Sequence, residues 1–210
     1  MSEVKPYLIG VAGPSCAGKT ELSRALAKRL DAVLLPLDAY YFDLSDRPIE
    51  ERARFNFDVP AALDHDIFFD HLQALREGHG IDRPVYDFAT HTRTTRTERI
   101  EPQQFVVVEG LFVLGWQDVR GLMGTKVFVD LDDPACLERR IYRDVRERGR
   151  TADSVVQQFT ETVAPMANLY VRPTREFADI VVPGDNPLAT SVATVLGHVE
   201  RHAGVSVLTR

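Results

Sequence analysis

The 210-residue chain has little of what marks a secreted, membrane-spanning or nucleic-acid-binding protein. It has two cysteines, Cys16 and Cys136, too few for a disulfide framework at this length, which favours a reducing, cytoplasmic location. Its net charge of −6 argues against a nucleic-acid partner. The longest apolar stretch, residues 105–116, contains Glu109 and is too short to span a bilayer. Residues 1–6 lack a signal-peptide profile.

The chain does contain a phosphate-binding pattern. Residues 13–20 read GPSCAGKT and fit G-x-x-x-x-G-K-[ST]. Glycines let backbone N–H groups turn toward a phosphate, the lysine reaches the β/γ-phosphates, and the threonine hydroxyl can bind Mg²⁺. An apolar run before the pattern and helical spacing after it favour a nucleoside-triphosphate site over an ordinary strand-to-helix turn. The predicted cradle comprises Gly13, Pro14, Ser15, Cys16, Ala17, Gly18, Lys19 and Thr20.

Apolar runs alternate with helical patterns, which predicts an α/β fold with a five-stranded parallel sheet covered on both faces. The predicted strands are Tyr7–Ala12, Ala32–Leu37, Phe105–Val108, Lys126–Leu131 and Asp179–Val182. The predicted helices are Gly18–Leu30, Asp64–Glu77, Leu111–Leu122, Pro134–Arg148, Ala152–Tyr170 and Asn186–His202. Pro165 should bend or interrupt the fifth helix.

Residues 79–102 break this alternation. Ile81–Phe88 and Thr90–Ile100 have the pattern of two exposed strands, the second rich in Thr and Arg. We expect a β-hairpin inserted into a single domain that spans residues 1–210.

Three of the predicted strands run into an acid, namely Asp38, Glu109 and Asp130. Ligands of open α/β sheets bind beyond the carboxyl ends of the strands, so these carboxylates are candidates for chemistry. One acid is needed to help hold Mg²⁺ opposite Thr20, and another to accept a proton from an attacking hydroxyl. Spacing alone leaves open which acid fills which role.

Residues 139–150 hold six arginines, a local reversal of charge in an acidic chain. One interpretation is a lid, covering about residues 139–158, whose guanidinium groups close over the triphosphate. The alternative is a solvated helix with i,i+4 ion pairs. Gly149 favours the lid, because it breaks the helix between Arg148 and Arg150. Arg139 and Arg146 are expected on the surface.

Taken together, these residues resemble the uridine kinase (uridine–cytidine kinase) family from the glycine loop to about Asn186. The most specific segment is Tyr86-Asp87-Phe88-x-x-His91-x-Arg93, followed later by Arg-Asp-x-x-Glu-Arg-Gly-Arg. The resemblance implies a three-layer P-loop kinase fold and phosphorylation of the 5′-hydroxyl of uridine or cytidine, with MgATP or GTP as donor. It also implies a homo-oligomer, a tetramer, with no membrane partner.

The resemblance assigns roles by position. Asp38 would be the general base, and Thr20 and Glu109 would hold Mg²⁺, which leaves Asp130 structural. Lys19, Arg148 and Arg150 would serve catalysis with Asp38, and Arg140 would bind the donor. The implied substrate contacts are Asp38, Tyr41, Asp58, Tyr86, Phe88, His91, Arg143, Arg148 and Gln158.

Three features depart from the family pattern: Pro14 and Cys16 inside the glycine loop, and a 183–186 loop that lacks the family's usual arginine. That loop lies near the expected adenine site, so the choice between ATP and GTP stays open. Two other functions also stay open. One is a P-loop kinase for another alcohol, similar to phosphoribulokinase or pantothenate kinase. The other is a nucleotide-binding regulatory protein without catalysis.

Overall fold

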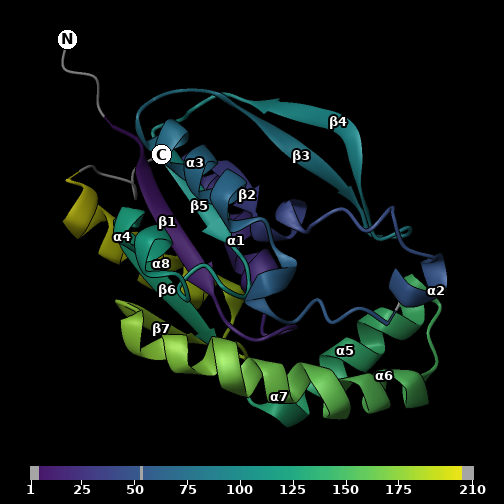
Figure 1. The fold of residues 1–210 in the computed structure, drawn as a ribbon. Helices are drawn as coiled ribbons and strands as arrows, with labels where there is room; N and C mark the ends of the chain where they lie inside the picture. Colours follow the sequence, from purple (N-terminus) through teal and green to yellow (C-terminus); the bar gives the residue numbers. More distant parts are fainter. Residues whose placement is uncertain (1–4, 53, 205–210) are drawn as a thin grey trace.

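A five-stranded parallel sheet forms the centre of the protein in a computed structural model that describes residues 5–52 and 54–204 (Figure 1). The strand order is β2-β5-β1-β6-β7. The strands are β1 (Tyr7–Ala12), β2 (Val33–Pro36), β5 (Phe105–Glu109), β6 (Thr125–Asp130) and β7 (Ile180–Pro183). All five predicted strands are confirmed, and each end either matches the prediction or differs from it by one residue.

Helices cover both faces of the sheet. Alternate residues of β1 point to opposite sides, with Ile9 and Val11 in one buried cluster and Leu8 in the other. Helices α1 (Lys19–Leu30) and α8 (Leu188–Ala203) pack on the first side, and α3 (His65–Arg76) and α4 (Gln117–Leu122) pack on the second. Among the described residues, no helix has the length and apolar character needed to cross a membrane.

The helix α5 (Asp133–Arg148) has clear signals at both ends. The Asp132 side chain accepts a hydrogen bond from the Ala135 N–H at 2.9 Å, which caps the first turn. Gly149 ends the helix with a left-handed φ of 64°, and its N–H donates to the Asp144 carbonyl. The predicted helix break at Gly149 is therefore confirmed.

The predicted helix Leu111–Leu122 is wrong in its first half, because α4 begins only at Gln117. Phe112, Val113 and Leu114 are all buried. Three successive buried side chains do not fit the one-sided face of a surface helix. A turn closed by the Gly115 N–H and the Phe112 carbonyl at 2.8 Å forms there instead.

The predicted helix Ala152–Tyr170 is continuous but irregular. Its parts are α6 (Ala152–Gln158), a π-helical turn (Phe159–Val163), α7 (Ala164–Met166), a second π-helical turn (Ala167–Val171) and a 3₁₀ segment (Arg172–Phe177). Pro165 has no N–H to donate, and the wider turns flank it on both sides. The expected disturbance at Pro165 is confirmed.

The predicted hairpin forms a separate two-stranded sheet of β3 (Ile81–Asp87) and β4 (Thr92–Ile100). Its turn is closed by Asp87, whose carboxylate accepts from the Ala89 N–H at 2.8 Å and the Thr90 hydroxyl at 2.9 Å. Figure 1 shows the hairpin extending away from the central sheet, with α5 and α6 on the opposite side of the molecule and the short helix α2 (Ile49–Arg52) between them.

Candidate active site

The phosphate-binding loop lies between β1 and α1, as its sequence predicts. Gly13 has a φ of 146°, and a Cβ there would lie 2.3 Å from the Val129 carbonyl oxygen, so only glycine fits. Lys19 is buried, and its Nζ donates to the Pro14 carbonyl at 2.8 Å. Pro14 lacks an N–H, but its carbonyl also accepts from the Ala17 N–H at 3.2 Å. The departure at Pro14 therefore leaves a closed, ordered loop.

The sheet order brings two of the three candidate carboxylates together. Asp38 follows β2 and Glu109 ends β5, and these strands are neighbours. Burial raises the pKa of Asp38, while the charges of Lys19, Arg148 and Arg143 act to lower it. Burial likewise raises the pKa of Glu109, against the lowering effect of Lys19. Both carboxylates therefore lie within the electrostatic reach of the loop lysine.

The third candidate, Asp130, has a structural environment. It pairs with Arg172 at 3.8 Å and with Arg175 at 3.2 Å. Both arginines belong to the 3₁₀ segment. Asp130 therefore ties β6 to that segment, in keeping with the structural role that the resemblance gives it.

Thr20 and Glu109 form a pair of oxygen ligands that fits Mg²⁺. The Thr20 hydroxyl donates to Glu109 Oε1 at 3.3 Å, and Glu109 is buried. Within residues 5–52 and 54–204, no group of three or more His, Cys, Asp or Glu side chains is placed to hold a metal ion. Mg²⁺ is commonly bound by one or two protein oxygens together with substrate phosphates and water, so the pair suffices.

Asp58 faces the same site from the loop before α3. Burial raises its pKa, and Arg140 lowers it, while the nearby charge of Asp38 raises it further. Its backbone N–H donates to Asn56 Oδ1 at 3.0 Å, which fixes the turn that carries it. A second carboxylate near Asp38 could accept hydrogen bonds from ribose hydroxyls.

Aromatic side chains from three segments meet beside these acids. Tyr41 contacts Tyr86 with ring centroids 5.4 Å apart and Phe57 at 5.2 Å, and Tyr86 contacts Phe88 at 5.2 Å. His91 stacks on Phe57 at 5.0 Å and 20°. We call these five residues the aromatic wall. Phe57 is absent from the sequence candidates, although it directly precedes Asp58.

Two members of the aromatic wall have polar atoms suited to a ligand. The Tyr86 hydroxyl is buried, and among the described residues it has no hydrogen-bond partner. Burial lowers the pKa of His91, and the charges of Arg148 and Arg52 lower it further. A neutral imidazole presents one donor and one acceptor, so it can meet either a carbonyl or an amine.

The predicted lid arginines converge on one carboxylate that sequence reasoning missed. Asp144 is fully buried and lies within 3.6 Å of the guanidinium groups of Arg140, Arg143, Arg148 and Arg150. We call these four side chains the arginine cluster. The one signal for it in the sequence is its spacing, because Asp144 lies four residues from both Arg140 and Arg148 in the predicted helix.

The arginine cluster is joined to its surroundings at both ends. Arg140 donates to the Ser15 hydroxyl at 3.0 Å and to Gln158 Oε1 at 3.2 Å, and Arg150 also donates to Gln158. Gln158 thus lies beside two of the predicted lid arginines. Arg146 is exposed and packs on Tyr142, as predicted. Arg139 is exposed too, but it also donates to the Ala17 and Gly184 carbonyls at 3.3 and 3.0 Å.

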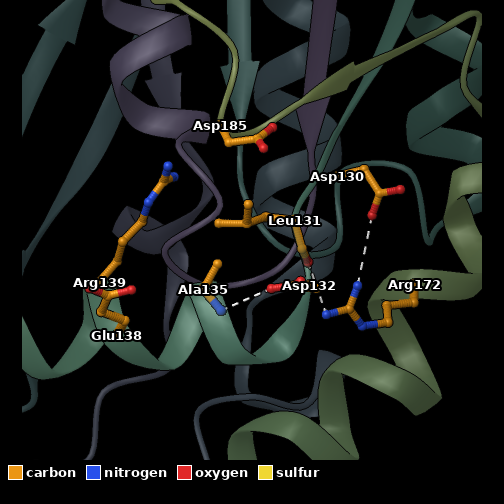
Figure 2. A pocket seen from close by; sticks show the side chains of 8 residues that line it. All are labelled: Asp130, Leu131, Asp132, Ala135, Glu138, Arg139, Arg172 and Asp185. Carbon is orange, nitrogen blue, oxygen red and sulfur yellow. Dashed lines mark hydrogen bonds and ion pairs between the residues drawn. The ribbon is translucent and has the colours of Figure 1, made fainter.

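A hollow of about 460 Å³ opens on the other side of the loop, at the ends of β6 and β7. Figure 2 shows the side chains that line it: Asp130, Leu131, Asp132, Ala135, Glu138, Arg139, Arg172 and Asp185. Arg139 connects the hollow to the phosphate-binding loop through the Ala17 carbonyl. The site that contains Asp38, Asp58 and Glu109 therefore lies on one side of the phosphate-binding loop, and this hollow lies on the other.

Comparison with known sequences gives a consistent result. The sequence profile of the Phosphoribulokinase / Uridine kinase family matches residues 8–190. The chain is 43% identical over 201 residues to a protein named uridine kinase from Chloroflexus aggregans, covering 94% of this chain and 96% of that one. It is also 43% identical over 192 residues to a protein named uridine kinase from Ligilactobacillus salivarius, and the match covers 89% of this chain and 90% of that one.

Solved structures share the fold at low sequence identity. A putative fructose transport system kinase from Silicibacter sp. TM1040 superposes with a TM-score of 0.71 at 20% identity, covering 87% of this chain and 92% of that one. Phosphoribulokinase from Rhodobacter spheroides superposes with a TM-score of 0.65 at 17% sequence identity, and the match covers 89% of this chain and 75% of that one. The expected P-loop kinase fold is confirmed.

Proposed function

The chain belongs to the phosphoribulokinase / uridine kinase family, and we propose that it is a nucleoside kinase of pyrimidine salvage. It transfers a phosphoryl group from MgATP to the 5′-hydroxyl of uridine or cytidine and releases UMP or CMP. The relatives of high coverage that bear the name uridine kinase support this reaction.

One observation carries the proposal: the aromatic wall stands beside the paired acids Asp38 and Asp58. A flat pyrimidine ring favours aromatic faces and a small number of directed hydrogen bonds. The Tyr86 hydroxyl and the neutral His91 ring supply such polar groups. A phosphorylated sugar or a flexible acid would make little use of such a wall, so the wall favours the nucleoside over other alcohols.

Asp38 is the proposed general base. It follows β2 directly, and its raised pKa brings it closer to the neutral range in which proton acceptance is most efficient. The carboxylate takes the proton of the 5′-hydroxyl as that oxygen attacks phosphorus. Asp58 and Arg143 hold the ribose, which keeps the hydroxyl in line with the phosphate.

Positively charged side chains stabilise the negative charge of the phosphates during the transfer. Lys19 exchanges the Pro14 carbonyl for a phosphate oxygen, and Arg148 and Arg150 face the charge that develops on the transferring group. Arg140 reaches the loop through Ser15. Mg²⁺, held by Thr20 and Glu109, supplies further positive charge to the phosphate oxygens when it is bound.

The donor base belongs in the hollow at the ends of β6 and β7. The acceptor groups lie on the β2 and β5 side of the loop, so the donor nucleoside extends to the opposite side. The 183–186 loop forms part of that hollow through Asp185. The proposal includes ATP as donor, with GTP as the alternative.

Two further features complete the proposal. Both cysteines are free thiols, which accords with a reducing cytoplasm. The family resemblance suggests a homotetramer of 23.6 kDa chains, and sedimentation equilibrium of the purified protein would test that assembly.

A coupled assay of ADP release tests the function. The acceptors are uridine, cytidine, thymidine, adenosine, ribulose 5-phosphate and pantothenate, each with MgATP and with MgGTP. We expect turnover with uridine and cytidine only. Turnover confined to ribulose 5-phosphate or pantothenate would replace the proposal, and nucleotide binding without turnover on any acceptor would support the regulatory alternative.

A further inference from the structure

Asp144 is an unusual residue for the surface-facing helix that carries it. It is fully buried, whereas Val145, Arg146 and Glu147 after it are exposed. Buried carboxylates are costly unless cations or donors meet them. Here one carboxylate has four guanidinium groups within 3.6 Å, at 2.8 Å (Arg143), 3.5 Å (Arg150) and 3.6 Å (Arg140 and Arg148).

The contacts with the Asp144 carboxylate hold the four arginine side chains close together, but most of them are too long to be hydrogen bonds. Among these four guanidinium groups, only that of Arg143 makes a described hydrogen bond to the Asp144 carboxylate, at 2.8 Å. Asp144 Oδ2 and Arg140 Nε are both buried, and neither has a hydrogen-bond partner among the described residues. The contacts of Arg140, Arg148 and Arg150 with the carboxylate, at 3.5–3.6 Å, are ion pairs rather than hydrogen bonds, so Asp144 does not use up their N–H donors.

The charge balance points the same way. Within the cluster itself, four guanidinium groups surround the single carboxylate of Asp144, so the arginines outnumber the acid that gathers them. Their repulsion is visible at Arg148, where burial, Arg143 and Arg140 lower the pKa while Asp144 raises it. Without the carboxylate, four like charges would have to separate. With it, they stay together and still favour an anion.

The backbone of Asp144 fixes the same region. Its carbonyl accepts from the N–H of Gly149 and from the N–H of Arg150 at 3.2 Å. The chain reversal that separates Arg148 from Arg150 is thus held by one residue. Arg140, in turn, carries the connection to the phosphate-binding loop through the Ser15 hydroxyl at 3.0 Å.

We propose that Asp144 is a positioning residue, which holds the arginine cluster together and orients Arg140, Arg148 and Arg150 toward the phosphates. The inference rests on the proposed function and deepens it, since it assigns a role to a residue that touches neither substrate. Arg140, Arg148 and Arg150 act on the phosphates, Arg143 acts on the ribose, and Asp144 acts through these arginines.

The variant Asp144→Asn keeps the size of the side chain and removes its charge. We expect kcat with uridine to fall by about 10²-fold, the loss typical when groups that stabilise transition-state charge are misplaced. Isothermal titration should give a MgATP Kd that is higher by about tenfold or more, with a stoichiometry still near one per chain. The matched control is Asp153→Asn, which makes the same chemical change at an exposed position in the first turn of α6 and should leave all three values unchanged.

Stoichiometry separates positioning from a purely structural role. If the variant merely unfolds part of the sample, the stoichiometry falls while the Kd of the remaining sites stays that of the wild type, which would overturn the proposal. An unchanged kcat would also overturn it. If Asp144→Asn does not fold, Asp144→Ser, which also removes the carboxylate, is measured, and a kcat equal to the wild-type value would be the contrary result. Wild-type inactivity on uridine with normal MgATP binding would instead refute the proposed function, and the MgATP titrations would still test Asp144.

Discussion

At the scale of single residues, Asp38 has the most specific chemical role in the proposed reaction. Replacing it with Asn removes the proton acceptor and preserves the shape, so kcat with uridine should fall by about 10²–10⁴-fold, the usual contribution of general acid–base catalysis. Uridine binding, measured by isothermal titration, should change little. Asp46→Asn, an exposed position eight residues further along, is the control. A near-normal kcat in Asp38→Asn would exclude Asp38 as the base.

His91 is expected to act on the pyrimidine alone. Replacing it with Ala removes a polar contact and its stack on Phe57, each worth about 0.5–1.5 kcal/mol. The KM for uridine should therefore rise by about tenfold, while the KM for MgATP stays the same. His79→Ala, at an exposed site, should leave both values unchanged. Equal increases in the two KM values would contradict a role confined to the base.

His65 predicts a pH-dependent contribution to stability. Its ring lies 3.0 Å from both Asp66 and Asp118. Burial lowers its pKa, but the hydrogen bonds to these two carboxylates raise it overall above 6.5. A raised folded-state pKa means that the stabilisation is fully present below the unfolded-state pKa and is lost as the pH rises through the folded-state value.

The Tm difference between wild type and His65→Gln should therefore be larger near pH 5.5 than near pH 8.5, on either side of the ordinary histidine range. His79→Gln, whose ring is largely exposed, should show a much smaller change with pH. A Tm difference that is constant between the two pH values would contradict the assignment.

At the scale of elements, Arg93 attaches the hairpin to the segment that carries the proposed general base. Its guanidinium donates to the Tyr40 and Tyr41 carbonyls at 3.1 and 3.2 Å and pairs with Asp64 at 2.9 Å. Arg93→Met would leave these acceptors without their donor, at about 1–3 kcal/mol for each buried group. We expect a lower Tm and a kcat/KM for uridine reduced by about tenfold or more, with MgATP binding retained.

The control is Arg99→Met, because Arg99 is half-exposed and pairs with Asp82 and Glu101 at the base of the hairpin. It should leave the kinetics unchanged. If both variants lose kcat/KM equally, general destabilisation of the hairpin would explain the loss, and the attachment through Arg93 would have no special role.

Elements with a clear local signal could be predicted from the sequence, and those decided by tertiary packing could not. The strands and the helix end at Gly149 follow from apolar runs and from glycine geometry. The helix predicted from Leu111 fails because its first residues are buried on all sides, which helical spacing alone does not reveal. The sequence likewise predicts a disturbance of the helix at Pro165, which lacks an N–H, but the π-helical form of the turns on either side depends on tertiary packing.

At the scale of the whole molecule, the sheet order separates the two proposed substrate sites. The carboxylates follow β2 and β5, the phosphate-binding loop follows β1, and the hollow opens at β6 and β7. Strand order depends on contacts between distant segments. The candidates Asp38 and Glu109 could be predicted from the sequence. The contact between Phe57 and His91, and the gathering of four arginines around Asp144, therefore could not.

The most direct test of the account is the identity of the product made from uridine and MgATP. Phosphorus-31 NMR of the reaction mixture distinguishes the positions, because a 5′-phosphate couples to two protons and a 2′- or 3′-phosphate to one. We expect uridine 5′-monophosphate as the sole nucleoside product, formed in equal amount to ADP. Phosphate on another hydroxyl, or ADP with only inorganic phosphate, would contradict it.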